Sequence, residues 1–255
     1  MTATRFLTIA SALAVVLGPT LASAQNTTAG TAFRLLVGQS PVRFSLTAAT
    51  TERWFDFQSR AGRSYCIEVS NTDDGSGGSL VQADPTVAVY SDAAGTASIG
   101  ANNDIETEPD GAFQSRVCFI STAAHDGRIK VTDATAGTAY YYIRIVESTL
   151  WSSWFFQGGD YNSFVLARNT TDGTCHAKIT WRTSSGVVAG ATDTLTVAAH
   201  AGIGTNSKSF VPTAINGTVE IAHDCSPEAL VGQMTSLSAS TGLGFDSPLL
   251  QRRPW

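Results

Sequence analysis

The acidic segment 102–110 holds the densest group of potential metal ligands in the chain. It reads Asn-Asn-Asp-Ile-Glu-Thr-Glu-Pro-Asp, and further aspartates precede it in the same half of the sequence. Carboxylate and amide oxygens are the ligands that Ca²⁺ prefers in proteins, so calcium is the one cofactor that these residue types favour. The spacing is not that of an EF-hand loop, and the alternative is a solvated turn whose carboxylates oppose self-association. The calcium candidates are Asp84, Asn103, Asp104, Glu106 and Asp110.

An aromatic run is the second group of residues that could do chemistry. Trp151, Trp154, Phe155 and Phe156 lie close together where the two halves of the sequence meet. Exposed rings could stack on sugars or bind another protein, whereas buried rings would hold two domains together. We expect the buried arrangement. Trp151, Trp154 and Phe155 are the candidates for binding a protein or a polysaccharide of the cell surface or matrix.

Catalytic motifs are not evident. His125, His176, His200 and His223 are scattered, without a His-Glu-x-x-His pair for zinc. The chain also lacks a Gly-x-Ser-x-Gly nucleophile turn. We therefore predict that the protein is not an enzyme, with no catalytic residues to name. The alternative is a hydrolase whose Ser-His-Asp triad is assembled from distant loops.

The four cysteines are expected to form two disulfides, one in each half of the chain. Cys66 and Cys118 lie in the first half, and Cys175 and Cys225 lie in the second. Four cysteines allow three pairings, and two separate domains would select the local one. Zinc is the rival interpretation, but no Cys-x-x-Cys spacing supports it. By strand alternation the first disulfide should lie on the outer face of a sheet, and the second should be buried.

The first 24 residues have the pattern of a secretory signal peptide. Arg5 precedes an apolar run from Phe6 to Leu17, and Ala22-x-Ala24 provides a cleavage site before Gln25. The run is shorter than the roughly 20 apolar residues that span a membrane, and no later stretch is long enough. We expect a secreted, periplasmic or cell-surface protein. Disulfides persist in such compartments.

Charge argues against two classes of partner. The chain has 16 Lys and Arg against 21 Asp and Glu, a formal net charge of -5. Nucleic acids and anionic membranes require a basic surface, so neither is an expected partner. Charged residues make up 15% of the chain, below the roughly 25% of an average domain. The surface must therefore be coated mainly with neutral polar groups.

Alternation with period two recurs throughout, and helical periodicity is nearly absent, which indicates an all-β fold. We expect two consecutive antiparallel β-sandwiches, spanning 25–148 and 149–242, followed by a tail at 243–255 without clear periodicity. In the first half the apolar rows are Phe55/Phe57, Tyr65/Ile67/Val69, Val87/Val89, Val117/Phe119, Ile129/Val131 and Tyr141/Ile143/Ile145. In the second half strands are expected at 163–168, 176–182, 193–197, 207–211 and 218–223.

Two stretches resemble known families. The segment 42–147, with Trp54-Phe-Asp-Phe57, Gly62-Arg-Ser-Tyr-Cys-Ile-Glu-Val69 and Gly137-Thr-Ala-Tyr-Tyr-Tyr-Ile-Arg-Ile145, resembles the bacterial pre-peptidase C-terminal domain. That resemblance implies a jelly-roll-like sandwich of the kind appended to secreted hydrolases. The chain departs from it in its acidic insertion, its cysteine pair and the lack of an attached peptidase. The second half, with Tyr161–Asn169 leading into Trp181–Gly186, looks like an immunoglobulin-like bacterial surface module.

These observations favour a secreted, non-catalytic protein for binding, adhesion or cell-surface structure. A subunit of an extracellular assembly, with the tail packing on a neighbour, is one alternative, and a secreted hydrolase is another. The sequence leaves the ligand and the oligomeric state open, because fold resemblance does not convey function.

Overall fold

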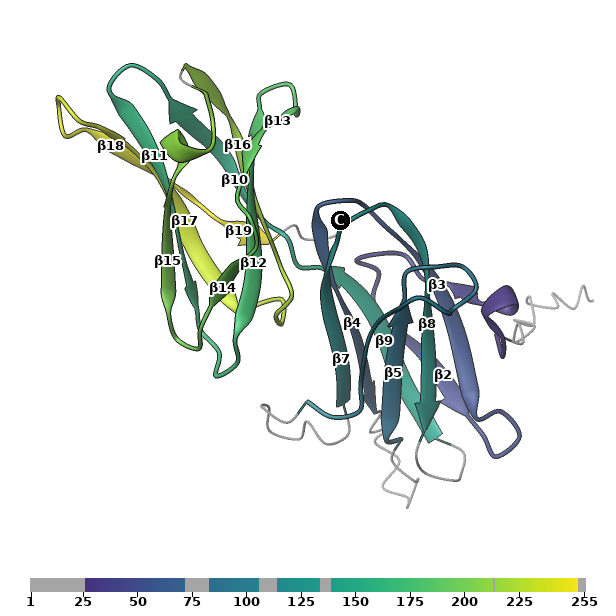
Figure 1. Cartoon of the computed structure of the whole chain (residues 1–255). Coiled ribbons are helices and arrows are strands. Elements are labelled where there is room, and N and C mark those ends of the chain that lie inside the picture. The colour runs from purple at the N-terminus through teal and green to yellow at the C-terminus, as the bar shows by residue number, and fades with distance from the viewer. Residues whose placement is uncertain (1–25, 72–82, 106–113, 134–138, 213, 252–255) are drawn as a thin grey trace, which may run out of the picture.

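The computed structural model describes residues 26–71, 83–105, 114–133, 139–212 and 214–251. These residues form two β-sandwiches side by side (Figure 1). The helical elements among them are short 3-10 turns, including η1 (Ala29–Thr31) and η3 (Ser207–Ser209). The predicted all-β fold is confirmed. The predicted signal peptide lies outside the described residues, and within them no helix is long and apolar enough to cross a membrane.

The first sandwich packs a five-stranded sheet against a four-stranded one. The first sheet has the order β1 (Phe33–Arg34), β3 (Glu52–Ser59), β8 (His125–Asp133), β5 (Pro85–Tyr90), β6 (Ser98–Asn102). The second has the order β2 (Val42–Leu46), β9 (Ala139–Glu147), β4 (Arg63–Asn71), β7 (Gln114–Ser121). All of the apolar rows predicted for this half are buried in its core, as expected for strands whose alternate side chains face one way.

The second sandwich is built in the same way from the rest of the chain. One sheet has the order β13 (Val188–Ala191), β12 (Cys175–Thr183), β16 (Ile215–His223), β10 (Leu150–Gln157), β19 (Leu250–Gln251), with β14 (Leu195–Val197) also paired to β12. The other has the order β15 (Gly202–Asn206), β11 (Tyr161–Asn169), β17 (Leu230–Ser238), β18 (Gly244–Pro248). Trp181, Phe155 and Ile221 are among its fully buried core residues.

One strand prediction for the second half is wrong, and the tail has more regular structure than its sequence indicated. The strand expected at 207–211 is instead the turn η3, because the Asn206 side chain accepts a hydrogen bond from the Lys208 amide (2.9 Å) and starts a helical turn. The tail expected from residue 243 onward is structured up to residue 251. It forms β18, which pairs with β17, and then β19, which pairs with β10 in the opposite sheet.

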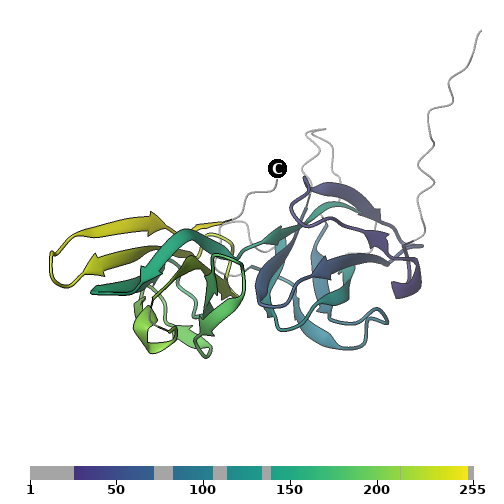
Figure 2. The ribbon, with the colours of Figure 1, turned by 90° about the horizontal axis from the view of Figure 1, so that it is seen from above.

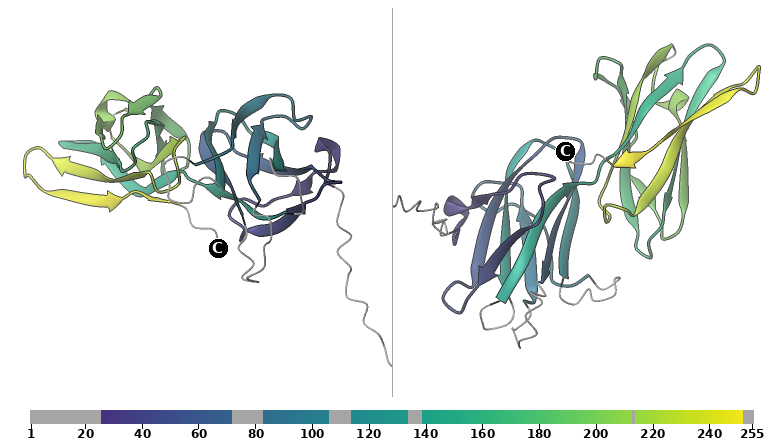
Figure 3. Two further views of the ribbon diagram at one scale, coloured as in Figure 1. Left: turned by 90° about the horizontal axis from the view of Figure 1, so that it is seen from below. Right: turned by 180° about the vertical axis from the view of Figure 1, so that it is seen from behind.

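The β17–β18 hairpin extends away from the first sandwich, at the far end of the molecule. Figure 2 shows this hairpin in yellow reaching beyond most of the second sandwich, and the two views in Figure 3 show the same projection from below and from behind. The tight turn that joins β10 to β11, in the opposite sheet, lies beside it, since Ala239 N donates to Asp160 O (3.0 Å). This turn and the β17–β18 hairpin lie together at the distal end of the second sandwich.

Both predicted disulfides are present. Cys66 and Cys118 are paired directly across β4 and β7, and Cys175 is bonded to Cys225. The first disulfide lies on the outer face of its sheet, as predicted, yet Cys66 is fully buried because the second sandwich covers it. Its sulfur lies 3.3 Å from the carbonyl oxygen of Cys225. Cys175 is buried in the core of the second sandwich.

The connection between the sandwiches is tightly packed. Ser148 and Thr149, which link β9 to β10, are fully buried, and the Ser64 amide donates to Thr149 Oγ1 (2.9 Å). The Arg63 guanidinium lies over the Trp151 ring, 3.7 Å from its centroid. Its nitrogens are 3.7 Å from Glu147 Oε1 and 3.5 Å from Glu220 Oε1, so residues of both sandwiches surround it.

Candidate binding site

A β-bulge in β10 decides which aromatic rings reach the surface. The pairing of β10 with β16 shifts register between Ser152 and Phe155. The bulge places an extra residue on β10, so Ser153 and Trp154 are both exposed while Ser152 and Phe155 are both buried. After the bulge, Trp154 and Phe156 project from the strand on the side opposite Phe155.

Four aromatic rings gather at the distal end of the second sandwich, and we call Trp154, Phe156, Tyr161 and Phe245 the aromatic shelf. Trp154 lies nearly parallel to Phe156, with centroids 6.3 Å apart, and 4.3 Å from Phe245. The centroid of the Tyr161 ring lies 5.7 Å from that of Phe156 and 6.4 Å from that of Phe245, so Tyr161 contacts both rings. The rings come from β10, β11 and β18, so the shelf depends on the packing of three strands.

Buried hydroxyl groups hold β10 in place beneath the shelf. Ser163 Oγ donates to Phe156 O (2.6 Å), and Ser163 and Ser236 lie within hydrogen-bonding distance of Phe156 N (3.3 and 3.4 Å). Both serines are fully buried. They bond the backbone groups of Phe156, which would otherwise be costly to bury. The two serines therefore hold the backbone from which the Phe156 side chain extends into the shelf.

The carboxylate of Asp160 links the β10–β11 turn to the β17–β18 hairpin beside the shelf. Asp160 lies in the tight turn between β10 and β11, next to Gly159, whose φ is +58°. Asp160 Oδ2 accepts hydrogen bonds from the Ser240 amide (3.1 Å) and from the hydroxyls of Ser238 and Ser240. We call Asp160, Ser238 and Ser240 the clasp. These hydrogen bonds lower the pKa of Asp160 to about 2, because each favours the ionised form.

The three aromatic candidates from the sequence occupy three different environments. Phe155 is fully buried in the core of the second sandwich, and Trp151 is half-buried beneath Arg63 at the junction. Trp154 is 42% exposed. Of the three, Trp151 alone lies between the two sandwiches, whereas Phe155 is buried within one of them and Trp154 reaches the surface.

Two members of the shelf were missed by the sequence reasoning. Tyr161 follows the turn Gly158-Gly159-Asp160, and Phe245 follows Gly242-Leu243-Gly244. An aromatic residue directly after a glycine-containing turn was the available signal in each case. It was overlooked for Phe245 because the segment was taken for a tail.

The calcium candidates fall partly outside the described residues, which include Asp84, Asn103 and Asp104 but neither Glu106 nor Asp110. Asn103 Nδ2 donates to Asp104 Oδ2 (3.1 Å). The pKa of Asp84 is raised, first by burial and then by the nearby carboxylates of Asp104 and Asp133. Among the described residues, no three His, Cys, Asp or Glu side chains are grouped as a metal site would require. Calcium binding stays a prediction.

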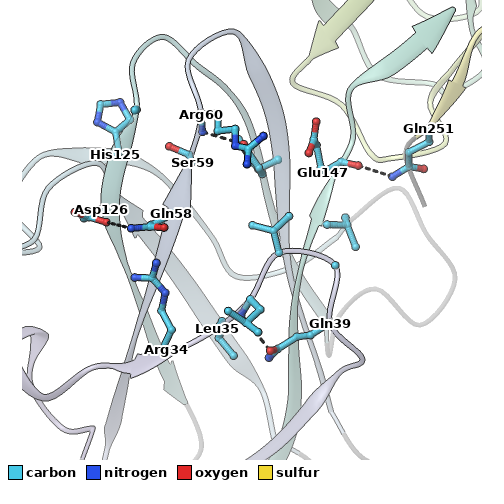
Figure 4. A pocket seen from close by; sticks show the side chains of 16 residues that line it. Arg34, Leu35, Gln39, Gln58, Ser59, Arg60, His125, Asp126, Glu147 and Gln251 are labelled. Carbon is cyan, nitrogen blue, oxygen red and sulfur yellow. Dashed lines mark hydrogen bonds between the residues drawn. The ribbon is translucent and has the colours of Figure 1, made fainter. Parts of the chain in front are cut away.

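A groove with a volume of about 900 Å³ lies beside the junction between the sandwiches (Figure 4). Several of its polar side chains bond within the groove. Gln58 Nε2 donates to Asp126 Oδ1 (3.0 Å), and Gln251 Nε2 donates to the Glu147 carbonyl (2.9 Å). The phenol ring of Tyr65 is only 2% exposed. The residues that line the groove therefore offer no exposed phenyl, phenol or indole ring for stacking, unlike the shelf.

The histidines lie apart from one another. His176 contacts Asp224 and His200 contacts Asp172, each at 2.8 Å and each at the surface. His125 lines the groove. His223 is fully buried, and burial lowers its pKa to about 4. The prediction that the protein is not an enzyme stays a prediction.

Comparisons with known proteins give only distant similarities. No family model and no curated protein matches the chain. The pre-peptidase C-terminal domain of collagenase from Bacillus anthracis is 12% identical, with a TM-score of 0.34, over 45% of this chain and 93% of that domain. The N-terminal CBM22-1-CBM22-2 tandem domain of Xyn10C from Paenibacillus barcinonensis is 10% identical, with a TM-score of 0.20, over 85% of this chain and 84% of that one. These similarities are too low to transfer a function.

Proposed function

We propose that this chain is an exported, non-catalytic binding protein whose aromatic shelf stacks on the sugar rings of a polysaccharide. The observation that carries the proposal is the exposure of Trp154 within a fixed group of four rings. A group of neighbouring rings with an exposed member, unlike apolar side chains scattered singly over a surface, is typical of a binding site.

The chemistry of the shelf suits a sugar. A pyranose ring presents a flat face of C–H groups with hydroxyls around its rim, and aromatic rings bury such faces well. Ser153, which directly precedes Trp154, is exposed and neutral and can bond the rim hydroxyls. The buried serines and the clasp hold the rings before the ligand arrives, which reduces the entropy lost on binding.

The predicted signal peptide and the disulfides support an extracellular location. The first 24 residues would direct export, and two disulfides are typical of proteins in oxidising compartments. The resemblances of the first sandwich to the pre-peptidase C-terminal domain and of the second to immunoglobulin-like modules belong to the same proposal. Both families occur as accessory modules of secreted proteins.

The test is binding of the mature protein to insoluble polysaccharides, with Trp154→Ala as the diagnostic variant. Truncating a central aromatic anchor typically costs at least about 1.4 kcal/mol, which is tenfold in affinity. We therefore expect Trp154→Ala to bind at least tenfold more weakly than wild type in depletion assays.

Phe210→Ala is the matched control for this test. Phe210 is 37% exposed and stacks on Trp181, outside the shelf. The control should bind like wild type. If wild type binds no polysaccharide in the panel, or if the Trp154 and Phe210 variants lose affinity equally, the proposed function is wrong.

A further inference from the structure

We propose that the shelf selects neutral polysaccharides against acidic ones, and that Asp160 is the residue that determines this selection. The inference rests on the proposed function and names its substrate class. Asp160 Oδ2 accepts a hydrogen bond from Ser238 Oγ, and Ser238 pairs directly with Tyr161 across β17 and β11, so the carboxylate lies at the edge of the shelf beside Tyr161. It is fully exposed, so a ligand on the shelf can reach it.

The clasp orients this carboxylate and leaves part of it available. The bonds from Ser238 and from the amide and hydroxyl of Ser240 all end on Oδ2. Oδ1 can therefore accept a hydrogen bond from a sugar hydroxyl. A hydrogen bond to a charged acceptor is stronger than one between neutral groups, so a ligand rich in hydroxyls gains from this contact.

The same carboxylate disfavours an acidic ligand. The hydrogen bonds of the clasp lower the pKa of Asp160 to about 2, so the group stays ionised at any ordinary pH. A uronic acid would bring a like charge to this site, and like charges in contact oppose binding.

The charge of the whole second sandwich points the same way but acts over a longer range. Residues 149–251 contain four basic side chains, Arg168, Lys178, Arg182 and Lys208. They contain seven acidic ones, Asp160, Asp172, Asp193, Glu220, Asp224, Glu228 and Asp246. Any test of Asp160 must therefore separate its local effect from a change of net charge.

The test compares sugars that differ in their carboxylates. Mature protein is run in native gels containing galactan or polygalacturonate, and in parallel gels containing mannan or alginate. The measured quantity is the ratio of retardation by the neutral polysaccharide to retardation by the acidic one of the same pair. We expect this ratio to be at least tenfold for wild type. Asp160→Asn should reduce it to about threefold or less, because the variant should bind the neutral polysaccharide more weakly and the acidic one more strongly.

Two variants control for charge and for structure. Asp172→Asn makes the same change of charge in the turn at the opposite end of β11. The nine residues of this strand separate Asp172 from Asp160 by about 27 Å, so this variant should keep the wild-type ratio. Ser240→Ala removes a bond of the clasp but keeps the carboxylate, so it should weaken binding to both members of a pair while lowering their ratio less than Asp160→Asn does. Melting temperatures of all variants show that each is folded.

The outcomes separate this inference from the proposed function. Binding that depends on Trp154 but shows equal retardation by neutral and acidic sugars would overturn the role of Asp160 and leave the proposed function standing. A ratio lowered equally by Asp160→Asn and Asp172→Asn would also overturn it, since net charge would then explain the selection. Absence of any binding to the four sugars, and to the insoluble panel, would overturn both.

Discussion

Arg63 is the side chain whose removal should most weaken the contact between the two sandwiches. It is 15% exposed and faces Glu220, which is 2% exposed, across the junction. Burial is the largest influence on its guanidinium and lowers its pKa. A cation held in such a place must be compensated by its neighbours, which here are Glu147, Glu220 and the Trp151 ring.

The free-energy cost of Arg63→Met arises because the carboxylates of Glu220 and Glu147 lose their nearby cation. Removing one partner of a buried ion pair costs about 3–5 kcal/mol, because the other charge stays buried without it. Glu220 keeps its hydrogen bond to Arg182 Nε (2.7 Å), so we take the lower end, about 3 kcal/mol. For a chain of this size, roughly 2–4 °C is lost per kcal/mol, so the melting temperature should fall by about 6–12 °C.

Differential scanning calorimetry of the mature protein measures this shift, with Arg43→Met as the control. Arg43 also lies over an aromatic ring, Tyr140, at 4.2 Å, but it is exposed and belongs to the first sandwich alone. An exposed cation–π contact is worth only about 0.5–1 kcal/mol, so the control should lose at most about 4 °C. Equal shifts for the two variants would refute the reasoning that buried charge joins the sandwiches.

Two further predictions concern titration. His223 has a pKa of about 4 in the folded state against about 6.5 unfolded, so the unfolded state binds more protons between these values. The free energy of unfolding should fall by about 3 kcal/mol as pH drops from 6.5 to 4. In thermal melts at pH 7 and 4.5, His223→Leu should show a smaller loss of stability between the two pH values than wild type does. Equal losses in wild type and variant would contradict this prediction. The pKa of Asp84 is raised in the folded state, so the ionised carboxylate destabilises the folded protein at pH values above the pKa of the unfolded state. Asp84→Asn should therefore raise the melting temperature at pH 7 in the presence of a chelator. The gain should vanish below about pH 4, where the carboxyl group is protonated in both states. A lower melting temperature at pH 7 would contradict this.

Strand alternation was sufficient to predict the core of the first sandwich. In β4, for example, Tyr65, Ile67 and Val69 are all buried on one face, with Cys66 on the other. The pleat imposes this period wherever one face of a sheet is covered. The same alternation placed Cys66 and Cys118 on the outer face of the sheet, whereas their pairing was predicted from the division of the four cysteines between two domains.

The shelf was harder to predict because it depends on exceptions to alternation. The bulge after Ser152 reverses the phase of β10, so a strict period of two would have placed Trp154 in the core with Ser152. Phe245 is the one aromatic residue in β18, where glycine, aspartate, serine and proline leave no apolar period to detect. The burial of Cys66 was equally hidden, since it arises from docking of a second domain.

Strand β10 connects the junction to the shelf. Its first residues pair with β19 and place Trp151 beneath Arg63, and its last residues carry Trp154 and Phe156. Eight strand residues span about 25 Å, so both contacts lie on a single stiff segment. The bulge between them turns the second group of rings outward without breaking the strand. The residues that contact the first sandwich and those that form the shelf are therefore carried by one continuous strand.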